Sequence, residues 1–220
     1  EKAHKMFLLI NESYNRLIKY HESYSGNNYT GTHQEPSYYE GHRESSNWEN
    51  DETPPTQTIE MVDKKWTDGT KYAGMTLGGQ FHGRGIYTYP NGDTYTGEFR
   101  FGKIQGEGQF TFTNGDKYIG EFIDGILNGQ GTYTYADGST YVGAFEDGVQ
   151  TGQGTKIWGP QTLLAGDKYV GTFSNGKQNG QGTYTYADGS TYVGGFKDNV
   201  KTGQGTKIWG PDTTLAGHKY

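Results

Sequence analysis

The stretch GQGTYTYADGSTYVG stands at residues 129–143 and occurs again, letter for letter, at residues 180–194. Self-similarity at a fixed distance is typical of repeat proteins and has to be recognised before other features are interpreted. One tyrosine of this stretch recurs along the chain in steps of 23, 23, 23, 28, 23 and 28 residues. The repeating unit therefore has 23 residues, two units carry five extra residues, and the identical stretches are two consecutive units copied as a pair. The recurring residues are Tyr72, Tyr95, Tyr118, Tyr141, Tyr169, Tyr192 and Tyr220.

Each unit has the pattern of two β-strands. Alternation places Tyr95, Gly97 and Phe99 on one face of a first strand, with threonine and glutamate on the other. Residues 106–112 form a second strand with glycine and phenylalanine at alternate positions, and the Asn-Gly pair at 114–115 is a strong hairpin signal. The repetition predicts an all-β fold: an elongated, single-layer antiparallel array of β-hairpins in which each unit contacts only its neighbours.

The composition indicates an unusual core. Only 34 of the 220 residues are Leu, Ile, Val or Phe, fewer than an ordinary globular core requires, but the chain has 19 Tyr and 37 Gly. Glycine in a strand leaves room for an aromatic ring to lie flat over the backbone, which stabilises designed sheets. We therefore expect a ladder of rings over glycine on one face, and a ribbon that curls into a trough around it.

These motifs resemble a known family. The pattern Tyr-x-Gly-x-Phe, a turn, Gly-x-Gly-x-x-x-Tyr and an Asn-Gly or Asp-Gly pair is similar to the MORN repeat (membrane occupation and recognition nexus) from about Trp66 to Tyr220. The resemblance implies six full repeats and the start of a seventh within residues 63–220, in an array that continues beyond Tyr220. Thr76 departs from the pattern in the first unit, where later units have phenylalanine, as suits an edge unit. Family members serve in ciliary radial spokes, cytoskeletal assemblies and membrane contacts, so the resemblance implies a cytoplasmic protein, with the cytoskeleton and the cilium as candidate locations.

The N-terminal segment has a different character. Residues 1–24 have apolar side chains at helical spacing, which predicts a short amphipathic helix that either docks to a partner or caps the first repeat. Residues 25–62 are polar and end near a Pro-Pro pair, as in an extended arm or linker. Residues 1–60 contain 5 Lys/Arg and 10 Asp/Glu, a net charge of −5, whereas residues 61–220 contain 14 and 15, a net charge of −1.

The sequence contains no pattern that predicts catalysis. It has no cysteine, its histidines are scattered, and no catalytic, metal-binding or cofactor-binding motif is present. Residues 171–177 have the spacing of a phosphate-binding loop, but Gln178 follows where Ser or Thr would be needed. The array also has no basic stripe for nucleic acid. We expect a non-enzymatic protein without cofactors.

Two surfaces are candidates for binding a partner protein. The first is the trough, whose rings would contact a helix or an extended segment. The second is the pair of longer loops, which should protrude from the same edge of the ribbon as identical knobs or fold back to cover that edge. The trough residues are Tyr95, Phe99, Tyr118, Phe122, Tyr141, Phe145, Tyr169, Phe173, Tyr192 and Phe196, and the loop residues are Trp158, Leu163, Leu164, Trp209 and Leu215.

These surfaces suggest a structural scaffold or protein-interaction module, with a large assembly as one setting for it. One alternative is an adaptor for phospholipid headgroups, which the nearly neutral repeats disfavour because headgroup binding strengthens with each basic residue. Another is a structural subunit of a filament or viral particle.

In two units lysine replaces the second-strand aromatic residue, at Lys156 and Lys207, and tryptophan follows two residues later.

Overall fold

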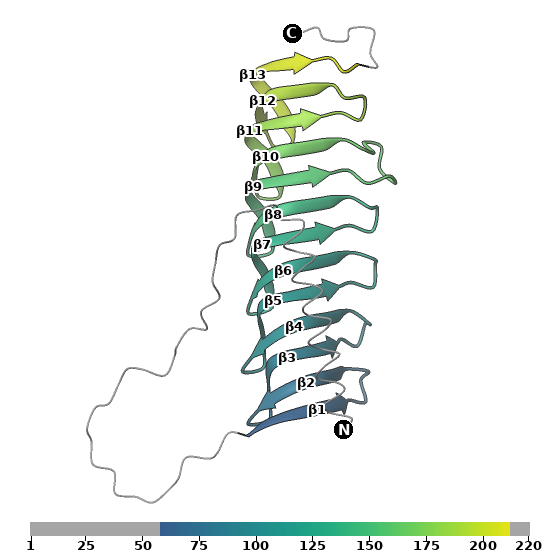
Figure 1. The fold of residues 1–220 in the computed structure, drawn as a ribbon, viewed down its shortest axis with the longest axis vertical. Coiled ribbons are helices and arrows are strands. Elements are labelled where there is room, and N and C mark those ends of the chain that lie inside the picture. The colour runs from purple at the N-terminus through teal and green to yellow at the C-terminus, as the bar shows by residue number, and fades with distance from the viewer. Residues whose placement is uncertain (1–57, 212–220) are drawn as a thin grey trace, which may run out of the picture.

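A computed structural model describes residues 58–211. Thirteen strands form one antiparallel sheet in which every strand pairs with its neighbours in the chain (Figure 1). The predicted all-β array of hairpins is therefore confirmed. The strands are β1 (Ile59–Lys65), β2 (Lys71–Leu77), β3 (Gln80–Thr88), β4 (Thr94–Arg100), β5 (Lys103–Thr111), β6 (Lys117–Ile123), β7 (Ile126–Thr134), β8 (Thr140–Glu146), β9 (Val149–Ile157), β10 (Lys168–Ser174), β11 (Lys177–Thr185), β12 (Thr191–Lys197) and β13 (Val200–Ile208).

Strands β2 to β13 form six units of two strands, which we number 1 to 6 along the chain. Strand β1 precedes these units and pairs with β2. The sheet therefore begins at Ile59, within the segment 25–62 that we expected to be an arm. The predicted helix at 1–24, most of that arm and the start of a seventh repeat lie outside the described residues.

Turns of two kinds alternate along the edges of the sheet. Inside each of the six units the turn has two residues, both with positive φ: Asp124, for example, has φ 50° and Gly125 has φ 83°. Such turns match the twist of the strands, and Asp, Asn and Gly tolerate the left-handed conformation best. Between units the turn is longer, as at Asn114-Gly115, where the Gly115 amide donates to the carbonyl of Phe112 at 3.0 Å.

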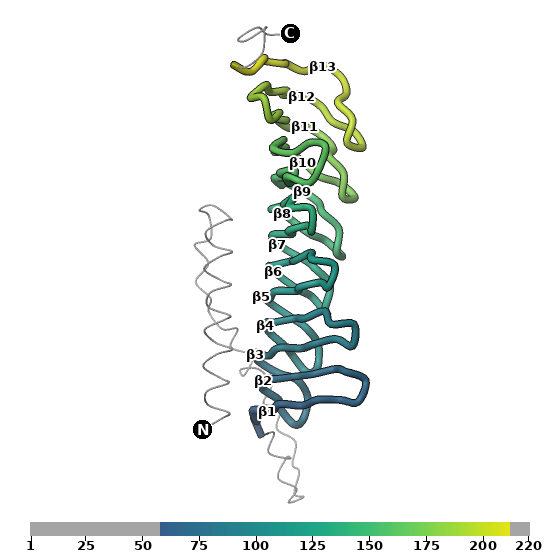
Figure 2. Tube along the Cα trace, turned by 90° about the vertical axis from the view of Figure 1, so that its right-hand side faces the viewer, coloured from purple at the N-terminus to yellow at the C-terminus, as the bar shows by residue number. Residues whose placement is uncertain are grey.

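Each hairpin is bent by a bulge in its second strand. Gly97 pairs with Gly108, and Phe99 pairs with Ile104, so one residue of β4 lies opposite three residues of β5. Gly106 lies in this bulge with φ 66°, and the other five units have a glycine with positive φ at the same place. Bulges bend and twist a strand. Figure 1 shows the hairpins curving away on the side of the two-residue turns, which makes the sheet a trough along its whole length, and Figure 2 shows the same stack from the side.

The core is a row of rings on the concave face. The Tyr95 ring lies so close to Gly108 that a Cβ there would come within 2.5 Å of it. Its hydroxyl donates to the carbonyl of Glu98 at 3.1 Å. The ring makes edge-on contacts with Phe99 of its own unit at 5.2 Å and with Phe122 of the next unit at 5.1 Å. The predicted stacking of rings over glycine is therefore confirmed.

We call the rings at the Tyr-x-Gly-x-Phe positions the inner row. The same edge-on contacts link its members from unit 2 to unit 6. In unit 1, where Thr76 replaces phenylalanine, Phe81 of the paired strand stacks on Tyr72 at 3.9 Å instead. The inner row comprises Tyr72, Tyr95, Phe99, Tyr118, Phe122, Tyr141, Phe145, Tyr169, Phe173, Tyr192 and Phe196.

Candidate binding groove

The ten rings that we predicted as a binding surface are the core of the array. Tyr95, Tyr118, Tyr141 and Tyr169 are 0% exposed, and the five phenylalanines are at most 4% exposed. Only Tyr192, the last inner-row tyrosine among residues 58–211, is half-buried, and its ring contacts Phe196 of its own unit. The bend in each hairpin and the contacts between units cover these rings. They therefore hold the array together and leave almost no area for a partner.

A second set of aromatic side chains lines the open part of the trough. They occupy the last position but one of each second strand and the position two residues later. Neighbouring rings form pairs, such as Phe110 and Phe112 at 4.5 Å and Tyr133 and Tyr135 at 4.6 Å. All are half-buried except Tyr184, which is buried. We call this set the outer row: Tyr87, Tyr89, Phe110, Phe112, Tyr133, Tyr135, Trp158, Tyr184, Tyr186 and Trp209.

The sequence analysis missed the outer row as a site, although a signal for it exists. Phe110 lies opposite Tyr95 in the sheet, so its ring has another ring beside it where an inner ring has glycine. The rings that lie against glycine are the inner-row tyrosines, which are buried except for Tyr192, whereas no outer ring lies against a glycine of residues 58–211. For tyrosine, the position of the ring relative to the glycines therefore separates the two rows.

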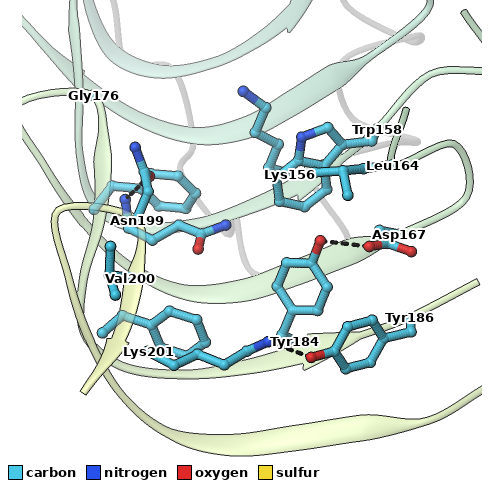
Figure 3. A pocket seen from close by; sticks show the side chains of 13 residues that line it. Lys156, Trp158, Leu164, Asp167, Gly176, Tyr184, Tyr186, Asn199, Val200 and Lys201 are labelled. Atoms are coloured by element: carbon cyan, nitrogen blue, oxygen red, sulfur yellow. Dashed lines mark hydrogen bonds between the residues drawn. The ribbon is translucent and has the colours of Figure 1, made fainter. Parts of the chain in front are cut away.

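The groove lies between the outer row and the side of the two-residue turns. Near its C-terminal end it encloses about 680 Å³. Figure 3 shows Trp158 and Tyr186 on one side of this space and Asn199, Val200 and Lys201 on the other. An adjoining hollow of about 640 Å³ lies against Trp158 and the long loop that follows it.

The wall opposite the outer row changes in character along the array. The second residue of each second strand pairs with an inner phenylalanine or its equivalent and faces the groove. This residue is apolar in units 1 to 3 and polar or charged in units 4 to 6. The series is Phe81, Ile104, Leu127, Gln150, Gln178 and Lys201.

Lysine also enters the outer row in units 4 and 6. Lys156 Nζ lies 5.2 Å from the ring centre of Tyr135, and Lys207 Nζ lies 5.2 Å from that of Tyr186. Lys201 approaches the Tyr186 ring from the opposite wall, at 4.5 Å, and also donates to its hydroxyl. Burial lowers the pKa of the Lys156 amine, and the nearby carboxylate of Asp137 acts in the opposite direction. Units 4 to 6 thus combine cations with aromatic rings, an arrangement that stabilises both.

Two rings of the outer row are held by hydrogen bonds to carboxylates. Asp167 accepts hydrogen bonds from the Tyr184 hydroxyl at 2.5 Å and from the Ala187 amide at 2.8 Å. Asp116 makes the equivalent pair of bonds in an earlier unit. Burial and the hydrogen bond to Asp167 raise the pKa of Tyr184, which keeps its hydroxyl protonated. These carboxylates therefore hold Tyr133 and Tyr184 in place before any partner binds.

The side chains of the long loop after β9 point in two directions. Trp158 turns into the groove and lies 5.4 Å from the Tyr184 ring. Leu163 is fully exposed and Leu164 is 45% exposed. The loop therefore folds its tryptophan back and leaves one leucine outside, which combines the two orientations that we considered. Trp209 takes the equivalent place after β13, with Lys207 Nζ 3.6 Å from its ring centre, and Leu215 lies outside the described residues.

Comparison with protein-family models identifies the repeat. The MORN repeat model matches residues 72–94, 95–117, 118–140, 141–162, 169–191 and 192–214. The chain belongs to the MORN-repeat family. Each match begins at an inner-row tyrosine, so the family pattern is the pattern of rings over glycine. MORN-repeat proteins are generally non-catalytic, and membership suggests a protein-interaction or membrane-associated module.

The other comparisons show less. No curated protein matches the sequence. Among solved structures, the TCP domain of SAS-4 (dCPAP) from Drosophila melanogaster, in complex with a proline-rich motif of Ana2 (dSTIL), is 13% identical with a TM-score of 0.41, over 73% of this chain and 87% of that one.

The described part of this MORN array has no arrangement that would support metal chemistry. Within residues 58–211, no group of three or more His, Cys, Asp or Glu side chains is placed to hold a metal ion. No helix within the same residues has the length and apolar character needed to cross a membrane.

Proposed function

We propose that this MORN protein is a non-catalytic scaffold that holds an extended segment of a partner protein along its groove. The observation that carries the proposal is the outer row, in which every unit adds one or two half-buried rings along one wall. Tyrosine and tryptophan are among the residues that most often anchor protein interfaces, because they bury a large area and lose the freedom of only two rotatable side-chain bonds.

The rigidity of the array supports the proposal. The rings are attached to one continuous sheet and are fixed by carboxylates such as Asp116 and Asp167. The two-residue turns of units 2 to 6 are also linked to the second strand of the preceding unit, as where the Gly125 amide donates to the carbonyl of Ile104 in β5 at 2.9 Å. A site that is already ordered loses little entropy when a partner binds, so more of the contact energy appears as affinity.

Affinity purification from cells that produce the protein tests the proposal. Full-length wild type is compared with a groove variant, Phe112→Ala with Trp158→Ala, by quantitative mass spectrometry. The matched control is Val170→Ala with Val193→Ala, since both valines are exposed and alternate with the inner row, which places them on the convex face. We expect at least one partner to be lost from the groove variant and kept by the control. Equal capture by all three proteins would contradict a role for the groove.

The lipid alternative is separated by flotation of the same proteins with liposomes that contain anionic phospholipid. Binding that weakens with salt and is equal for wild type and groove variant would favour a membrane adaptor instead.

A further inference from the structure

The spacing of the units restricts the conformation of a bound segment. Each unit contributes two strands, so the outer-row rings repeat about every 9.6 Å along the sheet, at ~4.8 Å per strand. A polyproline II helix has three residues per turn and rises ~3.1 Å per residue, so it repeats about every 9.3 Å. Such a segment would present the same face to every unit. Its backbone carbonyls have no internal hydrogen bonds and accept from tyrosine and tryptophan donors of aromatic-lined grooves.

The lysines of the groove restrict the composition of that segment, because the groove's own carboxylates are already engaged. Asp167 accepts from Tyr184 and Ala187, and Asp137 accepts from the Ser139 amide. Lys201 and Lys207 approach the same ring, that of Tyr186, from two strand positions. The equivalent site 51 residues earlier has Lys156 but has Gln150 in place of the second lysine. The two sites are four strands apart, about 19 Å, which six residues of polyproline II span at ~3.1 Å each. Cations at this spacing attract acidic side chains at the same spacing.

Resting on the proposed function, we propose that the groove of units 4 to 6 binds an acidic, proline-rich segment of a partner protein in the polyproline II conformation. Acidic residues six positions apart face Lys156 and the Lys201–Lys207 pair. The second contact is the stronger one because it has two cations. Prolines contact the rings between them, among which Trp158 and Tyr186 line the enclosed part of the groove.

The chain has an acidic segment with prolines of its own, residues 49–56. It cannot reach the second site of the same molecule. Its first residue is nine positions before Thr58, so it extends at most about 30 Å from the start of the sheet, at ~3.3 Å per residue. Strand β13 lies twelve strands from β1, about 58 Å away. Occupation of that site by residues 49–56 would require a second copy of the chain.

Fluorescence anisotropy with labelled synthetic peptides and the full chain tests the inference. The probe has twelve residues, with proline at every third position and glutamate at two positions six residues apart. Two matched probes replace glutamate by lysine or proline by glycine. We expect each replacement to weaken binding about tenfold, since the first loses charge complementarity and the second loses the preformed helix. Equal affinity for the three probes would overturn the inference.

Variants that change the charge of the groove identify where the probe binds. Lys201→Gln with Lys207→Gln should lower the affinity of the protein for the glutamate probe about tenfold, and Gln150→Lys should raise that affinity. The control, Lys117→Gln with Lys168→Gln, makes the same change of net charge next to inner-row tyrosines, on the convex face. Equal weakening by both pairs of lysine variants would also overturn the inference.

Two further results separate the possible occupants. If sedimentation velocity shows that the full chain dimerises and that Lys201→Gln with Lys207→Gln abolishes the dimer, the occupant is a second copy, and the proposal of a separate partner is wrong. If the probe fails to bind although the Phe112→Ala, Trp158→Ala variant loses its cellular partner, the groove binds protein of a different chemistry. In that case the proposed function stands and this inference falls.

Discussion

Tyr118 and Phe112 are both aromatic, lie on neighbouring parts of the sheet and face the same trough, yet their surroundings differ. Tyr118 lies against Gly131, is 0% exposed and contacts phenylalanines of two units. Phe112 has Phe110 and Tyr133 beside it and remains half-buried. The inner row thus provides the core that the aliphatic residues are too few to provide, and the outer row provides the surface. Aromatic residues thus have two roles, and for tyrosine these are separated by whether glycine lies below the ring.

The largest effect should follow from removal of an inner ring. Tyr118→Ala removes two edge-on contacts and the hydrogen bond from the Tyr118 hydroxyl to the carbonyl of Glu121. We expect a loss of about 3–5 kcal/mol in the free energy of unfolding, as for other large aromatic residues in cores. Urea denaturation followed by circular dichroism measures it. A loss below about 1 kcal/mol would show that the inner row is not the core.

A substitution below the ring should have a smaller but related effect. In Gly131→Ala the added Cβ would come within 2.4 Å of Tyr118 ring atoms, so the ring has to move. We expect a loss of about 1–3 kcal/mol, the usual range for overpacking. A double-mutant cycle with Tyr118→Leu identifies the cause, because the cost of Gly131→Ala should fall when the ring is absent. Additive effects would mean that the glycine is needed for another reason.

Much of the fold follows from the sequence because it depends on local spacing. The 23-residue period, the hairpins at Asn114-Gly115 and its equivalents, and the rings over glycine each follow from residues close together in the chain. The additional strand β1 was missed since its sequence, IEMVDKK, lacks the repeat pattern.

The site was harder to predict because burial depends on the bend of the sheet. Simple alternation treats a strand as straight and places every ring of one face in the same environment. The bulge at Gly106 adds two residues to β5, bends the hairpin and covers the inner row. Glycine is compatible with an extended strand as well as with a bulge. The glycine at this position therefore did not predict the bend. The direction of Trp158 likewise depends on a ring in the next unit, Tyr184.

The convex face offers a test of whether the rings alone determine stability. Burial, together with the charges of Glu121 and Glu98, raises the pKa of Glu107 to about 7. A carboxyl group whose pKa is raised in the folded state favours folding below its unfolded value, near 4.5, and this contribution is lost as the pH rises through 7. We therefore expect the melting temperature to fall by a few degrees between pH 5 and pH 8. Glu107→Gln should largely remove this dependence, whereas an unchanged slope would assign it to other groups.

The smallest effect on stability should come from the outer row. Phe112→Ala removes a half-buried ring that contacts Phe110 and Tyr133 but does not lie against a glycine, so we expect a loss of about 1 kcal/mol or less. The same substitution should weaken binding of a groove ligand by about 2 kcal/mol, because interface aromatics often contribute more to affinity than to folding. Urea denaturation gives the first value, and titration with the purified cellular partner gives the second, since the twelve-residue probe is expected to contact only units 4 to 6. If Phe112→Ala costs as much stability as Tyr118→Ala, the two rows form a single core and the division of roles between them is wrong.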